Sequence, residues 1–284
     1  MEHPLKSHTY NDRKKVVTHN NLITADCFAS LTLEEKKICY YAFAQCRMDD
    51  ISFFTEKIDL NELAAIINTT PKSLKRKAKK IEKTLFEHSI RIKKKYKLFE
   101  IFSFENNQFV FKLHSDMRPL LLKLKSNFSQ PDLSYFLKFK HSYTIAIWHL
   151  LQREMKSEFP RIDAPTIVKL SVDELRLVTG KQELDTQISH FRTRVLLPAI
   201  KDIQDNLYIK IDFVPYPSLR KISSYKFTIS NCVQLNPSDA LIEHVNKHKR
   251  CIELNFKKQN KKITPSEQEE LNLIKLVSLS HLHL

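Results

Sequence analysis

The 284-residue sequence predicts an α+β protein in which two similar domains follow one another, each a helix-turn-helix with paired strands behind it. Residues 58–95 and 170–229 carry this prediction. Each segment reads as a short helix, a turn, a long amphipathic helix and alternating strands. Residues 58–66 match residues 170–178 in capping position and apolar spacing. A repeat of this length indicates a duplicated domain rather than a solenoid.

The second segment has the clearest helix-turn-helix pattern. Ser171 with Glu174 three residues later is a capping box, which predicts that a short helix starts there. The helix is expected to end at Gly180, the only glycine of the chain, because a left-handed turn favours a residue without a Cβ. A long amphipathic helix over residues 184–205 and a strand pair within residues 207–229 complete a predicted winged helix.

The first segment follows the same order. Asp59 and Glu62 form a capping box for a short helix, and Pro71 is well placed as the first residue of the next helix. That helix is expected to run to about His88. Its core face is set by apolar residues at helical spacing, namely Leu74, Ala78, Ile81 and Leu85.

Further elements are expected around these segments. Thr32 and Glu35 form a third capping box. The helix that it opens, through about Arg47, has apolar residues on more than a narrow stripe, as in a helix that is central to a domain or shared with a partner chain. Asn106-Asn107 is a hairpin-turn signal. The other expected elements are strands over 51–58, 90–95, 98–104, 108–113 and 135–139, a short helix over 116–125 and an apolar helix over 141–155.

Residues 156–169 contain two prolines and no clear periodicity, which predicts a domain boundary there. The repeat is expected to place Ile90–Ile92 of the first domain in the position of Ile209–Ile211 of the second. The expected division is a basic N-terminal arm (1–15), a first winged-helix domain (16–156), a second winged-helix domain (165–236) and a C-terminal tail (237–284).

The chain is strongly basic. It has 47 Lys and Arg against 32 Asp and Glu, a net charge of +15 and a pI near 9.5, which favours nucleic acid as the partner before an anionic membrane. No run approaches the roughly 18 apolar residues of a membrane span. A single glycine excludes both the GxxxxGK[ST] phosphate loop and the GxGxxG dinucleotide turn. Five cysteines without a CxxC pair predict reduced thiols and a cytoplasmic protein.

The long helix of the second domain is the strongest candidate for reading DNA. Polar residues near its N-terminal end are expected to face outward or sideways, namely Thr186, Gln187, His190, Arg192, Thr193 and Arg194. A recognition helix presents such residues to base edges and phosphates in the major groove, where Arg can pair with guanine and Gln with adenine. The alternative is an ordinary amphipathic helix with a solvated face. The turn before the helix, the strand pair behind it and the net charge favour DNA binding.

The first domain has a second basic segment. Residues 72–97 contain twelve Lys or Arg and only two Glu. Lysines without interleaved Asn, Gln or aromatic residues suit phosphate contacts better than base reading, although a solubilising surface is the alternative. The full set of candidate DNA-binding residues is Lys72, Ser73, Lys75, Arg76, Lys79, Lys80, Lys181, Thr186, Gln187, His190, Arg192, Arg194, Arg220 and Lys221.

An enzymatic interpretation has little support. His281-Leu-His283 resembles the His pair of nicking enzymes, and Tyr40 or Tyr41 could act as a nucleophile. In such enzymes the pair lies on a central strand, whereas here it stands in the last four residues. No carboxylate cluster has metal-binding spacing. The sequence therefore predicts no enzyme activity, no metal and no cofactor.

Several motifs together resemble the replication initiator proteins of iteron-containing bacterial plasmids, a superfamily with two winged-helix domains. The resemblance covers roughly residues 15–231. It rests on Val16–Ile23, on Leu31–Ile38, on Leu170–Leu175 and above all on Phe191–Gln204, which looks like the family's recognition helix running into a Pro-Ala-Ile-x-x-Ile segment.

The resemblance implies a function. Such proteins bind repeated iterons at a plasmid origin as monomers, and many repress their own gene as dimers formed through the first domain. They open an AT-rich region and engage the host initiator, replicative helicase and chaperones. By this resemblance the second domain reads bases and the first holds phosphates. The alternative is a repressor with tandem winged helices and no initiator activity.

Overall fold

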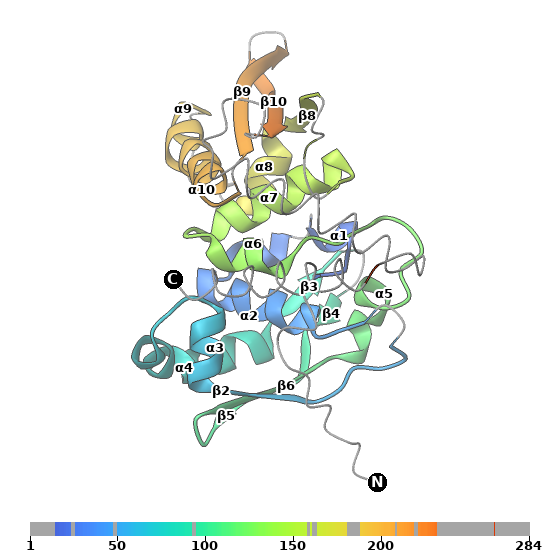
Figure 1. Ribbon diagram of the computed structural model, residues 1–284, viewed down its shortest axis with the longest axis vertical. Helices are drawn as coiled ribbons and strands as arrows, with labels where there is room; N and C mark the ends of the chain where they lie inside the picture. The colour runs from blue at the N-terminus through green and yellow to red at the C-terminus, as the bar shows by residue number, and fades with distance from the viewer. Residues whose placement is uncertain are drawn as a thin grey trace. The chain divides into compact units, whose positions relative to one another are not determined.

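Figure 1 shows a computed structural model of the protein. The structure describes residues 15–23, 26–47, 50–92, 95–157, 160, 164–180, 188–207, 209–218, 221–231 and 264. The chain forms two compact units, Met1–Ser230 and Asn231–Leu284. Among the described residues, no helix is both long and apolar enough to cross a membrane.

The described helices and strands lie between Thr18 and Asn231. The helices are α1 (Asn20–Ile23), α2 (Leu33–Ala44), α3 (Leu60–Ile66), α4 (Pro71–Glu87), α5 (Arg118–Leu121), α6 (Leu133–Lys138), α7 (Ser142–Met155), α8 (Val172–Thr179), α9 (Ile188–Phe191) and α10 (Leu197–Leu207). The strands are β1 (Thr18–His19), β2 (Glu56–Asp59), β3 (Ser89–Arg91), β4 (Lys95–Lys97), β5 (Phe99–Glu105), β6 (Gln108–Leu113), β7 (Phe128–Ser129), β8 (Thr166–Ser171), β9 (Ile209–Ser218) and β10 (Lys221–Asn231). There are 3-10 turns at Asp26–Ser30 and Ser115–Met117, and a π-helical turn at Arg192–Leu196.

Helix α2 lies in the core of the first half of the chain. Its predicted capping box is confirmed: Thr32 Oγ1 accepts the Glu35 N–H at 3.3 Å, and Glu35 Oε2 accepts the Thr32 N–H at 2.8 Å. All residues from Glu35 to Ala44 are buried, and the helix packs against α6. Of the two interpretations of its wide apolar surface, the structure therefore supports a helix central to its own domain.

Helices α3 and α4 form the first predicted helix-turn-helix. Asp59 is the N-cap of α3 and accepts the Asn61 N–H at 2.7 Å. Thr70 is the N-cap of α4, and Pro71 is its first residue, where its missing N–H costs no hydrogen bond. The predicted core face of α4 is confirmed, since its buried residues are Leu74, Ala78, Ile81 and Leu85.

A three-stranded antiparallel sheet follows, in the order β2-β6-β5. Its hairpin turns at Asn106-Asn107, as predicted; both residues have positive φ, 51° and 60°, which a tight hairpin of this type requires. The strand expected over 51–58 is shorter than predicted, since pairing begins only at Glu56.

The second half of the chain repeats this arrangement. Its sheet has the order β8-β10-β9, so in both halves the strand before the first helix pairs with the last strand of the hairpin. Between the strands, α8 ends at Gly180, which has the predicted left-handed conformation with φ 67°. The molecule is thus an α+β protein with two tandem winged-helix domains of the same topology.

Some sequence predictions are wrong. Residues 135–139 are not a strand: residues 135–138 belong to α6 and Phe139 is its C-cap. The N-cap of α6 is Asp132, which accepts the Ser134 N–H at 2.9 Å. Ile90 lies in β3, which pairs with β4, so β5 and not the 90–92 segment takes the place of β9. The helix expected over 116–125 is only a 3-10 turn followed by α5. Strand β8 occupies residues that were expected to be an irregular boundary.

Helix α7 carries a fully buried histidine. Tyr40 Oη lies 2.9 Å from His149 Nδ1, and Thr18 Oγ1 lies 3.3 Å from His149 Nε2. Burial, with a smaller effect of the Arg153 charge, lowers the pKa of His149 to about 3. The imidazole is therefore neutral in the fold and joins three elements, β1, α2 and α7.

We expect this histidine to make the fold sensitive to acid. The pKa of His149 is lower in the folded chain than in the unfolded chain, about 3 against 6.5, so its contribution to stability is full above pH 6.5 and is lost as the pH falls toward 3. The difference in unfolding free energy between the wild type and His149→Phe should shrink in this window by at most about 1.4 kcal/mol per pH unit. Urea unfolding at several pH values measures it. A difference that is independent of pH would contradict the assignment.

Candidate nucleic-acid interface

Helix α4 presents a basic surface on the side opposite its core face. Exposed residues at helical spacing form it, and we call them the α4 basic face: Lys72, Lys75, Arg76, Lys79, Lys80 and Lys83. Among these, Lys79 is paired with Glu82 at 2.8 Å, yet its side chain is 72% exposed. Ser73 is half-buried, and its N–H is held by Thr70 Oγ1 at 3.2 Å. With the exception of Ser73, the predicted DNA-binding residues of the first domain therefore lie together on one exposed surface.

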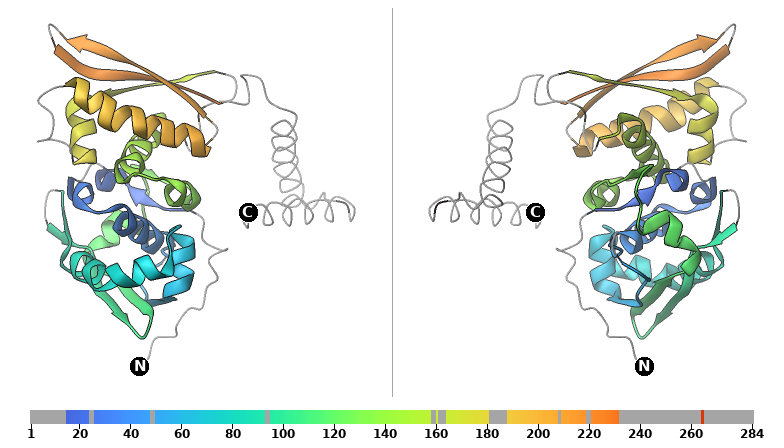
Figure 2. Two further views of the ribbon diagram at one scale, coloured as in Figure 1. Left: turned by 90° about the vertical axis from the view of Figure 1, so that its left-hand side faces the viewer. Right: turned by 90° about the vertical axis from the view of Figure 1, so that its right-hand side faces the viewer.

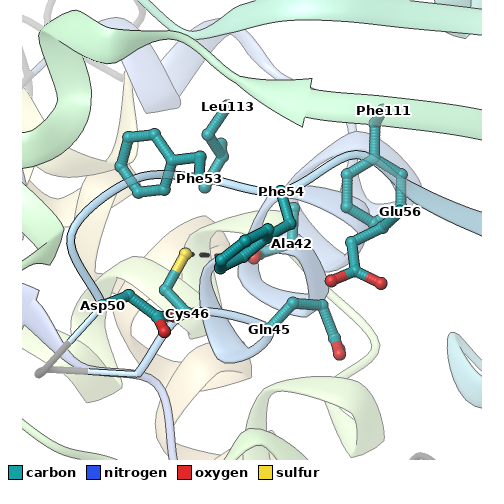
Figure 3. A pocket seen from close by; sticks show the side chains of 9 residues that line it. All are labelled: Ala42, Gln45, Cys46, Asp50, Phe53, Phe54, Glu56, Phe111 and Leu113. Carbon is teal, nitrogen blue, oxygen red and sulfur yellow. Dashed lines mark hydrogen bonds between the residues drawn. The ribbon is translucent and has the colours of Figure 1, made fainter. Parts of the chain in front are cut away.

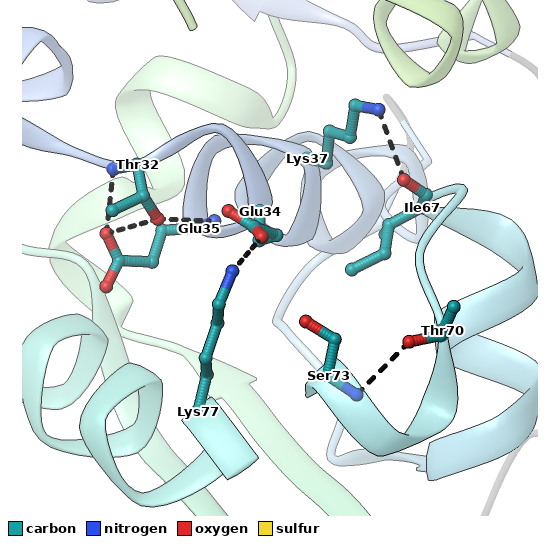
Figure 4. Close-up of polar contacts among 8 residues, drawn as sticks. All are labelled: Thr32, Glu34, Glu35, Lys37, Ile67, Thr70, Ser73 and Lys77. Atoms are coloured by element: carbon teal, nitrogen blue, oxygen red, sulfur yellow. Dashed lines mark hydrogen bonds and ion pairs between the residues drawn. The ribbon is translucent and has the colours of Figure 1, made fainter. Parts of the chain in front are cut away.

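Contacts from α2 fix the position of α4. Figure 4 shows the ion pair between Lys77 on α4 and Glu34 on α2, and the hydrogen bond that Lys37 Nζ donates to the Ile67 carbonyl at 3.1 Å. Ile67 is the C-cap of α3, immediately before the turn into α4. Lys77 therefore serves to hold the helix, whereas its neighbours on the exposed side remain available to a ligand.

Lys37 is an unusual lysine because it is buried. Desolvation lowers its pKa to about 8, although the charges of Glu34 and Asp202 act in the opposite direction. Its amine can donate to the Ile67 carbonyl in either protonation state. This side chain is a structural link between α2 and the helix-turn-helix and lies away from solvent.

In the second domain, the predicted long helix contains a π-helical turn. The Leu197 N–H bonds to the Arg192 carbonyl, five residues earlier. Pro198 explains this turn, because proline has no N–H and its ring would clash with the Arg194 carbonyl in a regular α-helix. The widened turn lies between α9 and α10, at the segment proposed to read bases.

The π-helical turn brings three consecutive residues to the surface. Arg192, Thr193 and Arg194 are all exposed, whereas Phe191 before them and Val195 after them are buried. These positions confirm the predicted outward orientation. The last residue of α9 thus anchors the turn in the core.

Two of these polar groups have contacts within the domain. The Arg192 guanidinium lies 5.8 Å from the centre of the Phe213 ring on β9, so it connects the helix to the hairpin. Thr193 Oγ1 donates to the Ser189 carbonyl at 3.0 Å and so points along its own helix. His190 is half-buried, which gives it a smaller exposed surface than the two arginines.

Several predicted residues lie outside the described part of the chain. They are Lys181, Thr186, Gln187 and Arg220. Lys221 is the first residue of β10, but its side chain is also outside the description. The structure therefore places Arg192 and Arg194 together at one turn and says nothing of these five side chains.

Two exposed features of the second domain were not predicted. Leu197 is 41% exposed beside the arginines. A signal was present, because Val195-Leu196-Leu197 is a run of three apolar residues in an amphipathic helix, and one of them must face outward. On the outer face of the sheet, Lys169 Nζ lies 4.0 Å from the centre of the exposed Tyr216 ring.

Neither of two surface hollows coincides with these basic surfaces. The hollow in Figure 3, at the end of α2 beside Cys46 and Phe53, has a volume of about 20 Å³, the size of one water molecule. A larger hollow of about 500 Å³ is lined by Lys15, Arg153 and Lys156 among others. Among the described residues, no group of three His, Cys, Asp or Glu could hold a metal ion; His281 and His283 lie outside them.

Both DNA-binding candidates lie in the first compact unit. In Figures 1 and 2, α4 and α9 lie on the same side of this unit. Each is the second helix of a helix-turn-helix, the position from which a recognition helix enters a groove. The arrangement can present the α4 basic face and the arginines that follow α9 to one duplex.

Comparison with solved structures finds the same fold elsewhere. The chain is similar to a crystal structure of the Pi initiator protein in complex with iteron DNA, with 20% identity and a TM-score of 0.65. The similarity covers 76% of this chain and 97% of that chain. No curated protein matches the chain in sequence.

Two family models match the sequence. One is described as "Initiator Replication protein, WH1" and matches residues 15–152; the other is described as "Initiator Rep protein, WH2" and matches residues 171–229. Together they account for well over half of the chain. The two winged-helix domains seen in the structure correspond to these two models in order and in content. The chain therefore belongs to the family of Rep initiator replication proteins.

Proposed function

We propose that this protein initiates plasmid replication by binding iterons at the origin as a monomer, and that it represses its own gene as a dimer. One observation carries the proposal: in both winged-helix domains, the second helix of the helix-turn-helix exposes basic residues to solvent. Family membership and the similarity to an initiator bound to iteron DNA support it. The activity consists of binding and opening DNA and needs no catalytic residue or cofactor.

We assign different tasks to the two domains. The second domain, residues 165–236, reads bases through Arg192 and Arg194, with Gln187, His190 and Thr186 nearer the start of the helix. Arg is suited to this because its fork can bond guanine O6 and N7 together. Lys181, Arg220 and Lys221 contact the flanking backbone.

The first domain, residues 16–156, holds phosphates through the α4 basic face and forms the dimer. Lysine is a point charge without a planar fork, so it positions the protein on DNA without selecting sequence. The basic arm, residues 1–15, precedes this domain, and the tail, residues 237–284, follows the second. The host initiator, replicative helicase and chaperones are the proposed partners, and the bacterial cytoplasm that holds the plasmid is the proposed location. Dimer repression links this activity to plasmid copy control.

The phosphate role predicts a uniform loss of affinity. Arg76→Ala combined with Lys79→Ala should weaken binding to cognate and random duplexes by the same factor, because phosphates are present in every sequence. The slope of log affinity against log salt should become shallower by up to about 2, roughly 0.9 for each lost contact. Fluorescence anisotropy at several salt concentrations measures both quantities.

A matched control removes two exposed lysines elsewhere. Lys125→Ala combined with Lys138→Ala changes the net charge equally but lies outside α4. It should leave the slope nearly unchanged. If the α4 variant loses affinity for the cognate duplex alone, the first domain reads bases and the division of tasks is wrong.

A further inference from the structure

Asp202 is a buried acid on α10, eight residues beyond Arg194 and ten beyond Arg192. Asp202 is only 5% exposed. Asp202 Oδ2 accepts the Lys140 N–H at 2.9 Å and the His141 N–H at 3.3 Å. Asn206 Nδ2 donates to Asp202 Oδ1 at 3.0 Å and so holds the carboxylate in this orientation.

The group that Asp202 contacts is the start of α7. His141 is the N-cap of this helix, but its side chain makes no capping hydrogen bond, and the first turn has no acidic residue. A helix N-terminus has unpaired N–H groups and a partial positive charge, which a carboxylate stabilises. Asp202 thus accepts, from the second domain, the N–H of the N-cap His141 and of Lys140 before it, and places a negative charge at the start of α7, where the helix's own side chains provide none.

The same end of α7 is also held from the first domain. Lys36 Nζ on α2 donates to the Ser142 carbonyl at 3.1 Å. Its neighbour Lys37 donates to the carbonyl of Ile67, the C-cap of α3 at the start of the turn into α4. Two neighbouring lysines of α2 therefore hold the α3–α4 turn and the start of α7, and Asp202 joins the start of α7 to α10, the helix that follows the π-helical turn with Arg194.

We infer that Asp202 is a positioning residue that fixes the recognition helix of the second domain relative to α4 of the first, and so sets the length of iteron that the protein accepts. The inference rests on the proposed function. Two tethered binding helices bind best when their separation matches the target, and a looser connection reduces both affinity and selectivity for spacing. Inserting one base pair moves the two groove contacts apart by about 3.4 Å and rotates them by about 35°.

The test uses the full chain and a set of duplexes. Footprinting first locates the two contacts on the iteron, and duplexes are then made with one base pair inserted or removed between them. The wild type should lose about 10-fold or more in affinity for each altered spacing. Asp202→Ala should lose affinity mainly for the native spacing, so that its three affinities lie within about 3-fold of one another.

Three variants separate positioning from other effects. Asp202→Asn keeps an oxygen that can accept the Lys140 and His141 N–H groups but loses the charge and the second acceptor, so it should keep part of the preference for native spacing. If it behaves like Ala, these hydrogen bonds are not the cause and the inference fails. Asp205→Ala removes an exposed acid from the same helix and should raise all affinities alike without altering the spacing profile. Asn206→Ala removes the hydrogen bond that orients the Asp202 carboxylate and should partly flatten the dependence of affinity on spacing. If Asp202→Ala does not fold, the spacing dependence of Asn206→Ala tests the inference in its place.

The outcomes are distinct. A wild-type spacing profile in both Asp202→Ala and Asn206→Ala overturns the inference and leaves the proposed function intact. A wild-type protein that shows no preference for the iteron over random duplexes overturns the proposed function itself. A flattened profile in folded Asp202→Ala, with a normal profile in Asp205→Ala and an intermediate one in Asp202→Asn, supports the inference, since a loss of stability alone would lower all affinities together.

Discussion

Gly180→Ala should destabilise the protein by about 2–5 kcal/mol. A residue with a Cβ pays roughly 1–2 kcal/mol in the left-handed conformation that Gly180 adopts at φ 67°. An added Cβ would also lie 2.8 Å from the Ala29 Cβ and 3.0 Å from the Ala29 carbonyl oxygen. Overpacking of this kind typically costs about 1–3 kcal/mol. Urea unfolding of the variant and the wild type measures the difference.

Two further variants separate the effect of the left-handed backbone conformation from that of the steric contact with Ala29. Lys156, the C-cap of α7, has φ 54° and already carries a side chain. Lys156→Ala should therefore change stability little. Ala29→Gly in the Gly180→Ala background removes the closest contact and should restore part of the loss. If Gly180→Ala lowers the free energy of unfolding by no more than Lys156→Ala does, the close approach between α8 and the 26–30 turn does not contribute to stability.

Arg194→Ala should reduce affinity for the cognate iteron by about 10- to 100-fold, which corresponds to roughly 1–3 kcal/mol for one bidentate base contact. Binding to random duplexes should fall much less, because only one phosphate-independent contact is lost. The preference at a single base pair should disappear. Competition with a set of iterons, each changed at one base pair, measures the affinity and locates the position.

Lys201→Ala is the matched control for this variant. Lys201 is also exposed and basic, but it lies on α10 about two turns beyond Arg194. It should leave the base preference unchanged. If Arg194→Ala weakens all duplexes equally, Arg194 contacts the backbone, and base reading must be assigned to other residues of the segment.

Local patterns predicted the elements that local chemistry controls. The Thr32–Glu35 capping box, the Asn106-Asn107 turn and the core face of α4 depend on neighbouring residues, and the structure confirms them. Helix α6 was mistaken for a strand because aromatic residues favour strands, although Leu133, Phe136 and Leu137 have helical spacing and are buried. Strand β8 was missed because its pairing with β10 lies far along the chain.

In the candidate interface too, local sequence patterns predicted some features, whereas others depend on contacts between distant residues. Periodicity correctly predicted that Arg192 and Arg194 are exposed. The π-helical turn that displays them depends on Pro198, and helical periodicity alone does not register the hydrogen bond that a proline removes. The contact of Gly180 with Ala29 and the hydrogen bonds that Asp202 accepts at the start of α7 join residues far apart in the sequence, so no local pattern could reveal them.

The most direct test of the proposed function uses duplexes cut from the DNA that flanks this protein's own gene. They are titrated by gel shift, and the mass of each complex is recorded. The proposal predicts one protein on each direct repeat and a dimer on an inverted repeat near the promoter. Dimers on a palindrome alone, with no binding to direct repeats, would contradict initiation and indicate a repressor.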